Sequence, residues 1–175
     1  MTTTITRQRV TLRPSTWEDI PRRVGWLNDP EVTEFTGTEA GETTIELAKR
    51  RQAERTWPDW IIEVKGRPIG CCTLCLDDAG QEASFGIVIG EKDCWDKGYG
   101  AAALREALRV GFEELGLHRV HLEVFLGNTR GIRCYEKCGF RREGLHLKAR
   151  WKRGRWQDMV SMAILREEWT RLSQM

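Results

Sequence analysis

The segment from Trp95 to Phe140 reads WDKGYGAAALREALRVGFEELGLHRVHLEVFLGNTRGIRCYEKCGF, and its pattern changes several times. It begins with a turn that contains two glycines. Apolar residues then recur at helical spacing, which predicts an amphipathic helix that ends at Gly116. These apolar residues are Leu104, Leu108, Phe112 and Leu115. A strand is predicted over Val120–Phe125, and a short helix over Thr129–Cys138.

Shorter patterns on both sides of this segment complete the predicted fold. Further strands are expected at 9–13, 60–64, 69–76, 83–89, 140–147 and 159–165. Two earlier helices are expected over about 16–27, with Pro21 as a kink near its start, and over about 44–55. The piece over about 83–125 is a parallel crossover. This order predicts an α+β fold in a single domain over 1–175, with a mixed, mostly antiparallel central sheet flanked by helices.

The composition excludes several classes of protein. The 175 residues include 28 basic and 26 acidic side chains, a formal net charge of +2, whereas a general nucleic-acid-binding protein is usually far more basic. No stretch approaches the ~20 apolar residues that span a bilayer, and the N-terminus MTTTITRQRV has no signal-peptide pattern. We therefore expect a cytoplasmic protein with no membrane partner, whose six cysteines are reduced thiols.

The turn at the start of the quoted segment predicts an anion site. Gly98 and Gly100 let the backbone turn sharply and approach a ligand, because neither has a Cβ atom. The free N–H groups of the helix that follows, with the positive end of its dipole behind them, favour a phosphate or pyrophosphate. The turn is not a Walker loop, and it lacks the third glycine of the dinucleotide fingerprint. Taken alone, the pattern also fits a simple turn.

A wider set of motifs resembles the GNAT acetyltransferase superfamily. The motifs are Gly98-Tyr99-Gly100, Gly116-Leu117-His118-Arg119, Leu122-Glu123-Val124, Asn128-Thr129-Arg130 and Tyr135-Glu136-Lys137-Cys138-Gly139-Phe140. Leu12-Arg13-Pro14 and Trp26-Leu27-Asn28-Asp29-Pro30 are similar to the branch of ribosomal-protein N-terminal alanine acetyltransferases and spermidine acetyltransferases. The resemblance implies acetyl-CoA as cosubstrate, transfer of acetyl to a primary amine and, as is common in this branch, a homodimer.

The resemblance also implies which residues hold acetyl-CoA. The backbone of Val88 and Ile89, on the strand before the turn, would pair with the pantetheine arm, and an N–H group of that region would polarise the thioester carbonyl. Asn128 would contact the pantetheine, and Arg133 would reach the cofactor from the short helix. The pyrophosphate would be held by Trp95, Asp96, Lys97, Gly98, Tyr99, Gly100 and Ala101. The family usually has Gln or Arg where this chain has Trp95, which affects only a side-chain contribution there.

Two residues are candidates for proton transfer. In the family the tyrosine of the Tyr-x-x-x-Gly-Phe segment is the general acid, which implies that Tyr135 protonates the departing thiolate. Glu123 matches the glutamate that is the base in some alanine N-acetyltransferases, and alternation along the strand separates it from Leu122 and Val124. Glu123 would take the ammonium proton directly or through water; a relay of waters, with Glu123 merely solvated, is the open alternative. Direct attack by the amine in a ternary complex fits these residues.

Cysteine and histidine pairs raise the alternative of a metal site. Cys72 and Cys75 satisfy C-x-x-C, but residues three apart on a strand face opposite sides and cannot share a metal without a bend. The other pairs are better explained as small buried thiols or as diverging side chains. They are Cys134 with Cys138 and His118 with His121. We therefore predict no metal.

Two segments of opposite charge bear on the acceptor. The stretch 148–155 (KARWKRGR), followed by Trp156, fits a hairpin turn at Gly154, although its charge and aromatic rings also suit RNA. In the family that the chain resembles, this hairpin borders the acceptor site, which implies an acidic or RNA-associated protein substrate as a third possibility. The loop over about 28–42 is acidic and suits a cationic acceptor, although a solvated acidic loop is the more ordinary explanation. Its acidic residues are Asp29, Glu31, Glu34, Glu39 and Glu42.

The sequence therefore predicts an N-acetyltransferase whose acceptor is a protein N-terminus or a small amine. A polyamine or aminoglycoside acetyltransferase is the alternative within the same chemistry. An acyl-CoA-binding or RNA-binding module without catalytic activity is the alternative from another class, although the near-neutral charge argues against a nucleic-acid partner.

Overall fold

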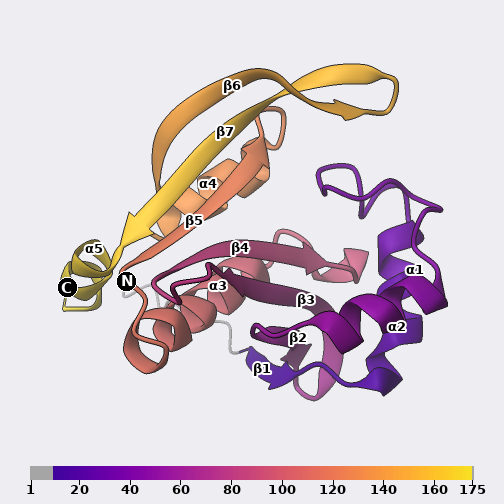
Figure 1. Cartoon of the computed structure of the whole chain (residues 1–175), viewed down its shortest axis with the longest axis horizontal. Helices are drawn as coiled ribbons and strands as arrows, with labels where there is room; N and C mark the ends of the chain where they lie inside the picture. Colours follow the sequence, from indigo (N-terminus) through magenta and orange to yellow (C-terminus); the bar gives the residue numbers. More distant parts are fainter. Residues whose placement is uncertain (1–9, 175) are drawn as a thin grey trace, which may run out of the picture.

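The computed structural model describes residues 10–174; Arg9, with which the first predicted strand begins, lies outside this range. Within it, seven strands form one mixed sheet in the order β1-β2-β3-β4-β5-β7-β6 (Figure 1). The strands are β1 (Thr11–Pro14), β2 (Asp59–Val64), β3 (Arg67–Leu76), β4 (Glu82–Ile89), β5 (Arg119–Phe125), β6 (Arg141–Lys152) and β7 (Arg155–Leu165). The α-helices are α1 (Ile20–Asn28), α2 (Ile45–Glu54), α3 (Tyr99–Arg109), α4 (Thr129–Lys137) and α5 (Arg166–Ser173).

Neighbouring strands of the sheet are antiparallel except β4 and β5, which are parallel. Because α3 connects these two strands, the crossover predicted over 83–125 is confirmed. The helix continues as a short π-helical segment, Val110–Glu114, before the chain reverses at Gly116 with a φ of +74°. The predicted α+β class and the mixed, mostly antiparallel sheet are confirmed.

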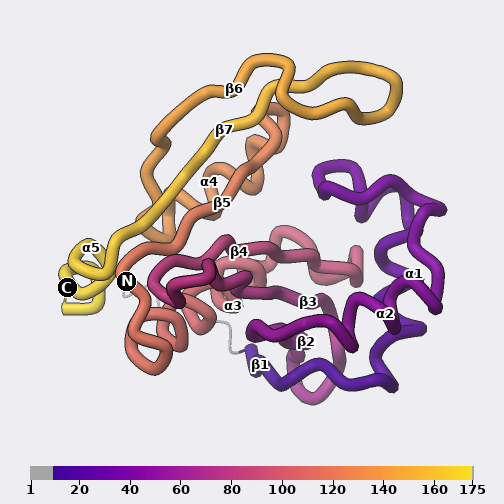
Figure 2. Tube along the Cα trace, viewed as in Figure 1, coloured from indigo at the N-terminus to yellow at the C-terminus, as the bar shows by residue number. Residues whose placement is uncertain are grey.

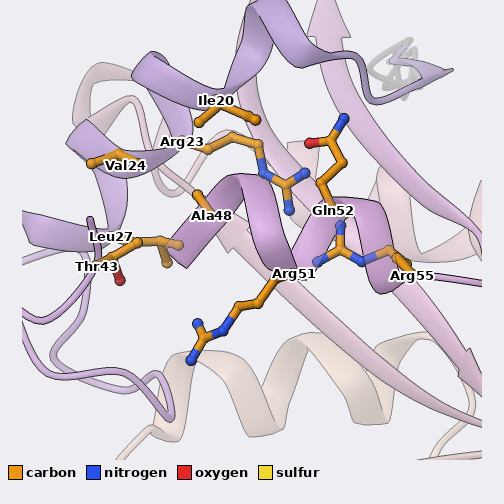
Figure 3. Close-up of a pocket in the computed structure, with 9 residues that line it drawn as sticks. All are labelled: Ile20, Arg23, Val24, Leu27, Thr43, Ala48, Arg51, Gln52 and Arg55. Atoms are coloured by element: carbon orange, nitrogen blue, oxygen red, sulfur yellow. The ribbon is translucent and has the colours of Figure 1, made fainter. Parts of the chain in front are cut away.

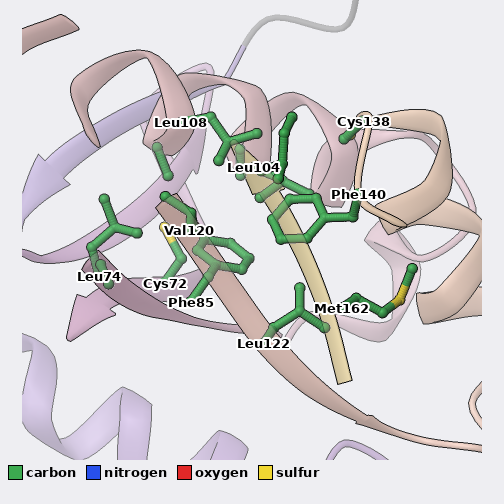
Figure 4. Packing of buried hydrophobic residues seen from close by; sticks show 14 of the residues in the cluster. Cys72, Leu74, Phe85, Leu104, Leu108, Val120, Leu122, Cys138, Phe140 and Met162 are labelled. Carbon is green, nitrogen blue, oxygen red and sulfur yellow. The ribbon is translucent and has the colours of Figure 1, made fainter. Parts of the chain in front are cut away.

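The main hydrophobic core lies between α3 and the sheet (Figure 4). Leu104 and Leu108 of α3 are fully buried, and alternation along β5 sends Leu122 and Val124 into the same cluster. Burial of one such side chain stabilises the fold by roughly 2 kcal/mol. These contacts therefore determine where the N-terminus of α3 lies relative to β4 and β5.

The first two helices lie at one end of the sheet and α5 at the other (Figure 2). Pro21 is in the first turn of α1, where its missing N–H breaks no helical hydrogen bond. The predicted kink is therefore wrong, because Pro21 lies at the start of the helix. Thr44 caps α2 as expected, because its hydroxyl accepts from the N–H of Leu47 at 3.1 Å. Trp26 of α1 covers Gly90 so closely that a Cβ atom at Gly90 would lie 2.1 Å from its ring.

The main differences from the sequence prediction lie at the first helix, at the last two strands and after the last strand. The first helix begins as a 3-10 turn, Trp17–Asp19, and becomes α-helical only at Ile20. The last two strands are longer than predicted, since β6 reaches Lys152 and β7 starts at Arg155, although the hairpin turn at Gly154 is confirmed. The prediction omits α5, whose start after Leu165 has no Ser, Thr, Asp or Asn cap.

Candidate active site

The parallel strands β4 and β5 pair only at their beginnings. The register joins three residue pairs, of which the last is Ser84 with His121, and no later residues of these two strands pair. Figure 1 shows the strands running apart beyond this point. Because β3 follows β4 as far as Ile89 and β7 follows β5 as far as Phe125, only the facing edges lack a strand partner. We call this region the β4–β5 opening.

The peptide groups of Ile87 and Ile89 face the β4–β5 opening. The N–H of Gly90 donates to the carbonyl of Ile69 on β3 at 2.8 Å, and peptide groups of successive residues alternate between the two edges of a strand. An extended ligand with amide groups, such as pantetheine, can pair with these edges as an added strand. The sequence does not single out Ile87, which alternation identifies once the neighbouring strand is known. The contacts of Val88 and Ile89 with the cofactor stay predictions.

The turn before α3 has the geometry of an anion site. Gly98 is the N-cap of this 11-residue helix and has a φ of +79°, which glycine adopts without strain. The N–H of Ala102 donates to the carbonyl of Gly98 at 3.1 Å. The N–H groups of Tyr99, Gly100 and Ala101 come before that bond, so they have no acceptor within the helix. These groups suit the pyrophosphate that the sequence assigns to them.

Trp95 ties this turn to both β4 and α4. Its indole N–H donates to the carbonyl of Ile89 at 2.8 Å, and the guanidinium carbon of Arg130 lies 4.7 Å from its ring centroid. Arg130 also approaches Asp96 at 3.7 Å. The stacked pair therefore places a positive charge beside the N-terminus of α3. The sequence does not single out Arg130, although its spacing of three from Arg133 puts both on one face of α4.

The remaining predicted cofactor residues lie around the same turn. Asn128 caps α4, and its side-chain oxygen accepts from the N–H of Gly131 at 2.9 Å. Lys97 in the turn and Arg133 on α4 are exposed. Their positive charges can reach a phosphate group from solvent, whereas part of the Asn128 side chain is already used in the cap.

Tyr135 lies on the face of α4 that packs against the core. Its ring centroid is 6.0 Å from that of Phe140. Burial, with a smaller effect of Cys134 and Cys138, raises the pKa of the Tyr135 phenol above its usual value near 10. No hydrogen bond from residues 10–174 contributes to this shift. At neutral pH the phenol is therefore protonated and free to donate to a developing anion.

Glu123 lies on the other face of the sheet. Its side chain is exposed, whereas Leu122 and Val124 on either side of it are buried, as the alternation predicts. Its direct neighbour on β7 is Ser161. The structure thus places Tyr135 and Glu123 on opposite faces of the sheet, with Glu123 just beyond the last residue of β5 that pairs with β4. An acceptor amine that approaches Glu123 would therefore meet the β4–β5 opening from the face opposite α4.

Two charged segments contact each other on the Glu123 face. We call residues 29–42 the acidic loop and residues 148–156 the basic hairpin. The Lys152 ammonium donates to the backbone carbonyls of Thr36 at 2.7 Å and Thr38 at 2.8 Å. It also lies 5.8 Å from the ring centroid of Phe125, which shares a face of β5 with Glu123. The acidic loop and the basic hairpin therefore form one continuous wall.

Comparison with known proteins decides the family. The sequence model described as "Acetyltransferase (GNAT) domain" matches residues 9–141. The chain belongs to the GNAT acetyltransferase family. The predicted family is confirmed, and the protein is an N-acetyltransferase that uses acetyl-CoA as its donor.

Individual relatives agree with this assignment. The acetyltransferase is 27% identical over 175 residues to the "Uncharacterized N-acetyltransferase p20" of Bacillus licheniformis, across 95% of this chain and 98% of that protein. It is 32% identical over 94 residues to the spermidine N(1)-acetyltransferase of Vibrio cholerae, across 54% of each chain. The structure of Vibrio cholerae spermidine N-acetyltransferase with CoA and spermine matches this chain with a TM-score of 0.85. The match covers 94% of this chain and 99% of that chain at 23% identity, so it shows a shared fold.

The structure gives a simple explanation for the C-x-x-C pair. Cys72 is buried in the core, while Cys75 lies three residues further along β3 and is only partly buried. Among residues 10–174, no group of three or more His, Cys, Asp or Glu side chains could hold a metal ion. In the same part of the acetyltransferase, no helix has the length and apolar character needed to cross a membrane.

A separate cavity of about 60 Å³ lies between α1 and α2 (Figure 3). Arg23 of α1 and Arg55 after α2 line it, and both pair with Asp59. The buried hydroxyl of Thr43 in its wall has no partner among the described residues. A cavity of this size has room for only a few water molecules, so it is too small for acetyl-CoA.

Proposed function

We propose that this acetyltransferase acts by direct attack of a primary amine in a ternary complex at the β4–β5 opening. The observation that carries the proposal is the position of Tyr135 and Glu123 on opposite faces of the sheet, with Glu123 beside the β4–β5 opening. Because amine and thioester can meet there from two sides, the mechanism needs no covalent acyl group on the protein.

The residues around the opening fit acetyl-CoA. The free N–H groups at the N-terminus of α3 suit its pyrophosphate, and the N–H and carbonyl of Ile87 with the N–H of Ile89 suit the pantetheine amides. Lys97 and Arg130 add positive charge beside the helix terminus. When bound, acetyl-CoA supplies an activated acetyl group as a thioester.

The chain's own residues then handle protons. Glu123 accepts a proton from the acceptor ammonium, directly or through water, so that a neutral amine attacks. A backbone N–H of β4, from Ile87 or Ile89, donates to the carbonyl oxygen. As the N–C bond forms and the C–S bond breaks, Tyr135 donates its phenolic proton to the sulfur. The amide nitrogen then loses its second proton to solvent, and the Tyr135 phenolate takes up a proton from solvent, which restores the phenol.

We propose a protein N-terminus or a small amine as the acceptor. The local similarity to a spermidine N(1)-acetyltransferase supports a small amine, and keeps a polyamine or aminoglycoside as the alternative. A protein acceptor is supported by Trp151 and Trp156 of the basic hairpin, which pack edge to face at 5.5 Å and remain 56% and 57% exposed. Exposed tryptophans are typical anchors for a protein partner.

The direct test is thiol release from acetyl-CoA with a panel of N-terminal peptides, monoamines, polyamines and aminoglycosides. We expect turnover that depends on the acceptor with at least one of these classes. Acetyl-CoA binding without such turnover, together with tight RNA binding, would refute the proposal and support a binding module.

We also propose a homodimer. The edge strand β6 exposes Leu145 and Leu147, which are 55% and 70% accessible in the single chain. Static light scattering of the full chain is expected to give about twice its 20.2 kDa, and a monomeric mass would refute the homodimer.

A further inference from the structure

Lys152 is the only buried residue of β6, with 3% of its surface exposed. A charged group at such a position needs partners, because removal from water disfavours the charge. Burial accordingly lowers the pKa of Lys152, while the nearby carboxylate of Glu39 acts in the opposite direction. The partners that do hold the ammonium are the carbonyls of Thr36 and Thr38 and the ring of Phe125. We call these three groups the ammonium cage.

The ammonium cage is chemically suited to any primary ammonium. Two backbone carbonyls accept its N–H groups, and an aromatic face attracts its charge. None of the three groups is a carboxylate, so the fit depends on hydrogen bonds and the ring face and not on an ion pair. The Lys152 side chain reaches the cage from the basic hairpin, whereas the cage itself belongs to the acidic loop and β5.

The ammonium cage lies close to the proposed position of the acceptor. Phe125 follows Glu123 by two residues and points to the same face of β5. At a rise of about 3.3 Å per residue, the two side chains leave the strand about 7 Å apart. A second ammonium on an acceptor whose reacting nitrogen is at Glu123 would therefore reach this cage.

We propose that Lys152 is a specificity-determining residue, whose own ammonium fills the position at which the site would otherwise hold a second cation of a diamine or polyamine. The inference rests on the proposed function, in which the acceptor amine meets Glu123. In the wild type a second amine on the acceptor then brings no gain, so monoamines and peptide N-termini are accepted as well as diamines. A Lys152 that only ties the loop to the hairpin would instead affect all acceptors equally.

The test compares butylamine with 1,4-diaminobutane, which differ by one terminal ammonium, as acceptors for the full chain. Wild type, Lys152→Ala and Arg155→Ala are assayed; Arg155→Ala removes an exposed positive charge from the same hairpin and is the matched control. Counted per reacting amine, kcat/KM should be similar for the two acceptors in wild type and Arg155→Ala. In Lys152→Ala the diamine should gain at least about tenfold, because the vacated cage holds its second ammonium.

An unchanged ratio in an active Lys152→Ala variant overturns the proposal. A wild type that already prefers the diamine by about that factor overturns it as well. In both cases turnover with the monoamine shows that the proposed function itself is intact.

Thermal unfolding tests the ammonium cage without any turnover. Butylammonium should raise the unfolding temperature of Lys152→Ala but not of wild type or Arg155→Ala. Tetramethylammonium, which has no N–H to donate, should not. Equal effects of both salts overturn the proposal, even if no amine is ever acetylated and the proposed function fails. If Lys152→Ala folds poorly, the refolding yield in the two salts gives the same comparison, and equal yields overturn the proposal.

Discussion

Replacing Tyr135 with phenylalanine removes one oxygen and keeps the ring. The ring retains its contact with Phe140 at 6.0 Å, and the hydroxyl loses no hydrogen bond to residues 10–174. The free energy of unfolding should therefore change by less than about 0.5 kcal/mol. A positioned general acid contributes about 10²–10⁴-fold to the rate, or roughly 3–5 kcal/mol. We expect kcat to fall by about that factor while KM for acetyl-CoA stays within about twofold.

The pH dependence of kcat is a second test of the role of Tyr135. Because burial raises the pKa of the Tyr135 phenol, the wild type should keep its acid up to a pH above the usual value of about 10. No alkaline loss of kcat assigned to this group is expected below that pH. The assay is thiol release at saturating amine, with urea unfolding to verify stability.

The matched control is Tyr99→Phe, which alters the other of the two tyrosines, at the first turn of α3. It should leave kcat unchanged. An unchanged kcat in Tyr135→Phe would remove Tyr135 from the mechanism. Equal losses in the two variants would show that a phenol near the cofactor matters for binding and not as an acid.

Three further predictions test the base and the scaffold. Glu123→Gln should lower kcat about 10–100-fold at neutral pH. The loss should become smaller as rising pH deprotonates the amine in solution. If wild type and variant have the same kcat at every pH, water and not Glu123 accepts the ammonium proton. Gly90→Ala should cost about 1–3 kcal/mol in urea unfolding, since its Cβ would lie 2.1 Å from the Trp26 ring, whereas Gly25→Ala has open space and should not destabilise. The Arg13 guanidinium lowers the pKa of Asp19 from 3.8 to about 2. About 2 kcal/mol of folding stability should therefore be present above pH 3.8 and be lost as the pH falls towards 2. Asp19→Asn should remove this pH dependence of the free energy of unfolding.

Local patterns in the sequence were sufficient for most elements of the fold. Alternation in β5 and the spacing of apolar residues in α3 reflect contacts with one core, so a short window contains the signal. The outer half of β6 has no such signal, because its residues up to Lys152 are almost all exposed. Pairing with β7 makes it a strand, and that contact is not visible along one segment. The start of α5 was missed for a similar reason, since Leu165 lacks a capping side chain.

The candidate site was predictable where backbone geometry decides it. Gly98 requires a positive φ, and the strand-to-helix turn then directs free N–H groups to one place. The stacking of Arg130 on Trp95 and the burial of Lys152 were not predictable in this way. Lys152 and Thr36 are 116 residues apart, and their contact depends on how a loop and a hairpin meet. Such contacts leave no periodic pattern in the sequence.

The structure changes the electrostatic role expected for the acidic loop and the basic hairpin. Taken separately, the acidic loop would attract a cationic acceptor and the basic hairpin an anionic one. In the structure, Asp29 and Glu31 pair with Lys92 at 2.9 and 3.0 Å, and Glu39 accepts from the backbone N–H of Arg153 at 3.1 Å. The Lys92 ammonium offsets the charges of Asp29 and Glu31, so the acidic loop presents less negative field to a distant acceptor. We therefore expect selection of the acceptor to depend also on the shape and hydrogen bonds of the wall that the two segments form together, which is where the ammonium cage lies.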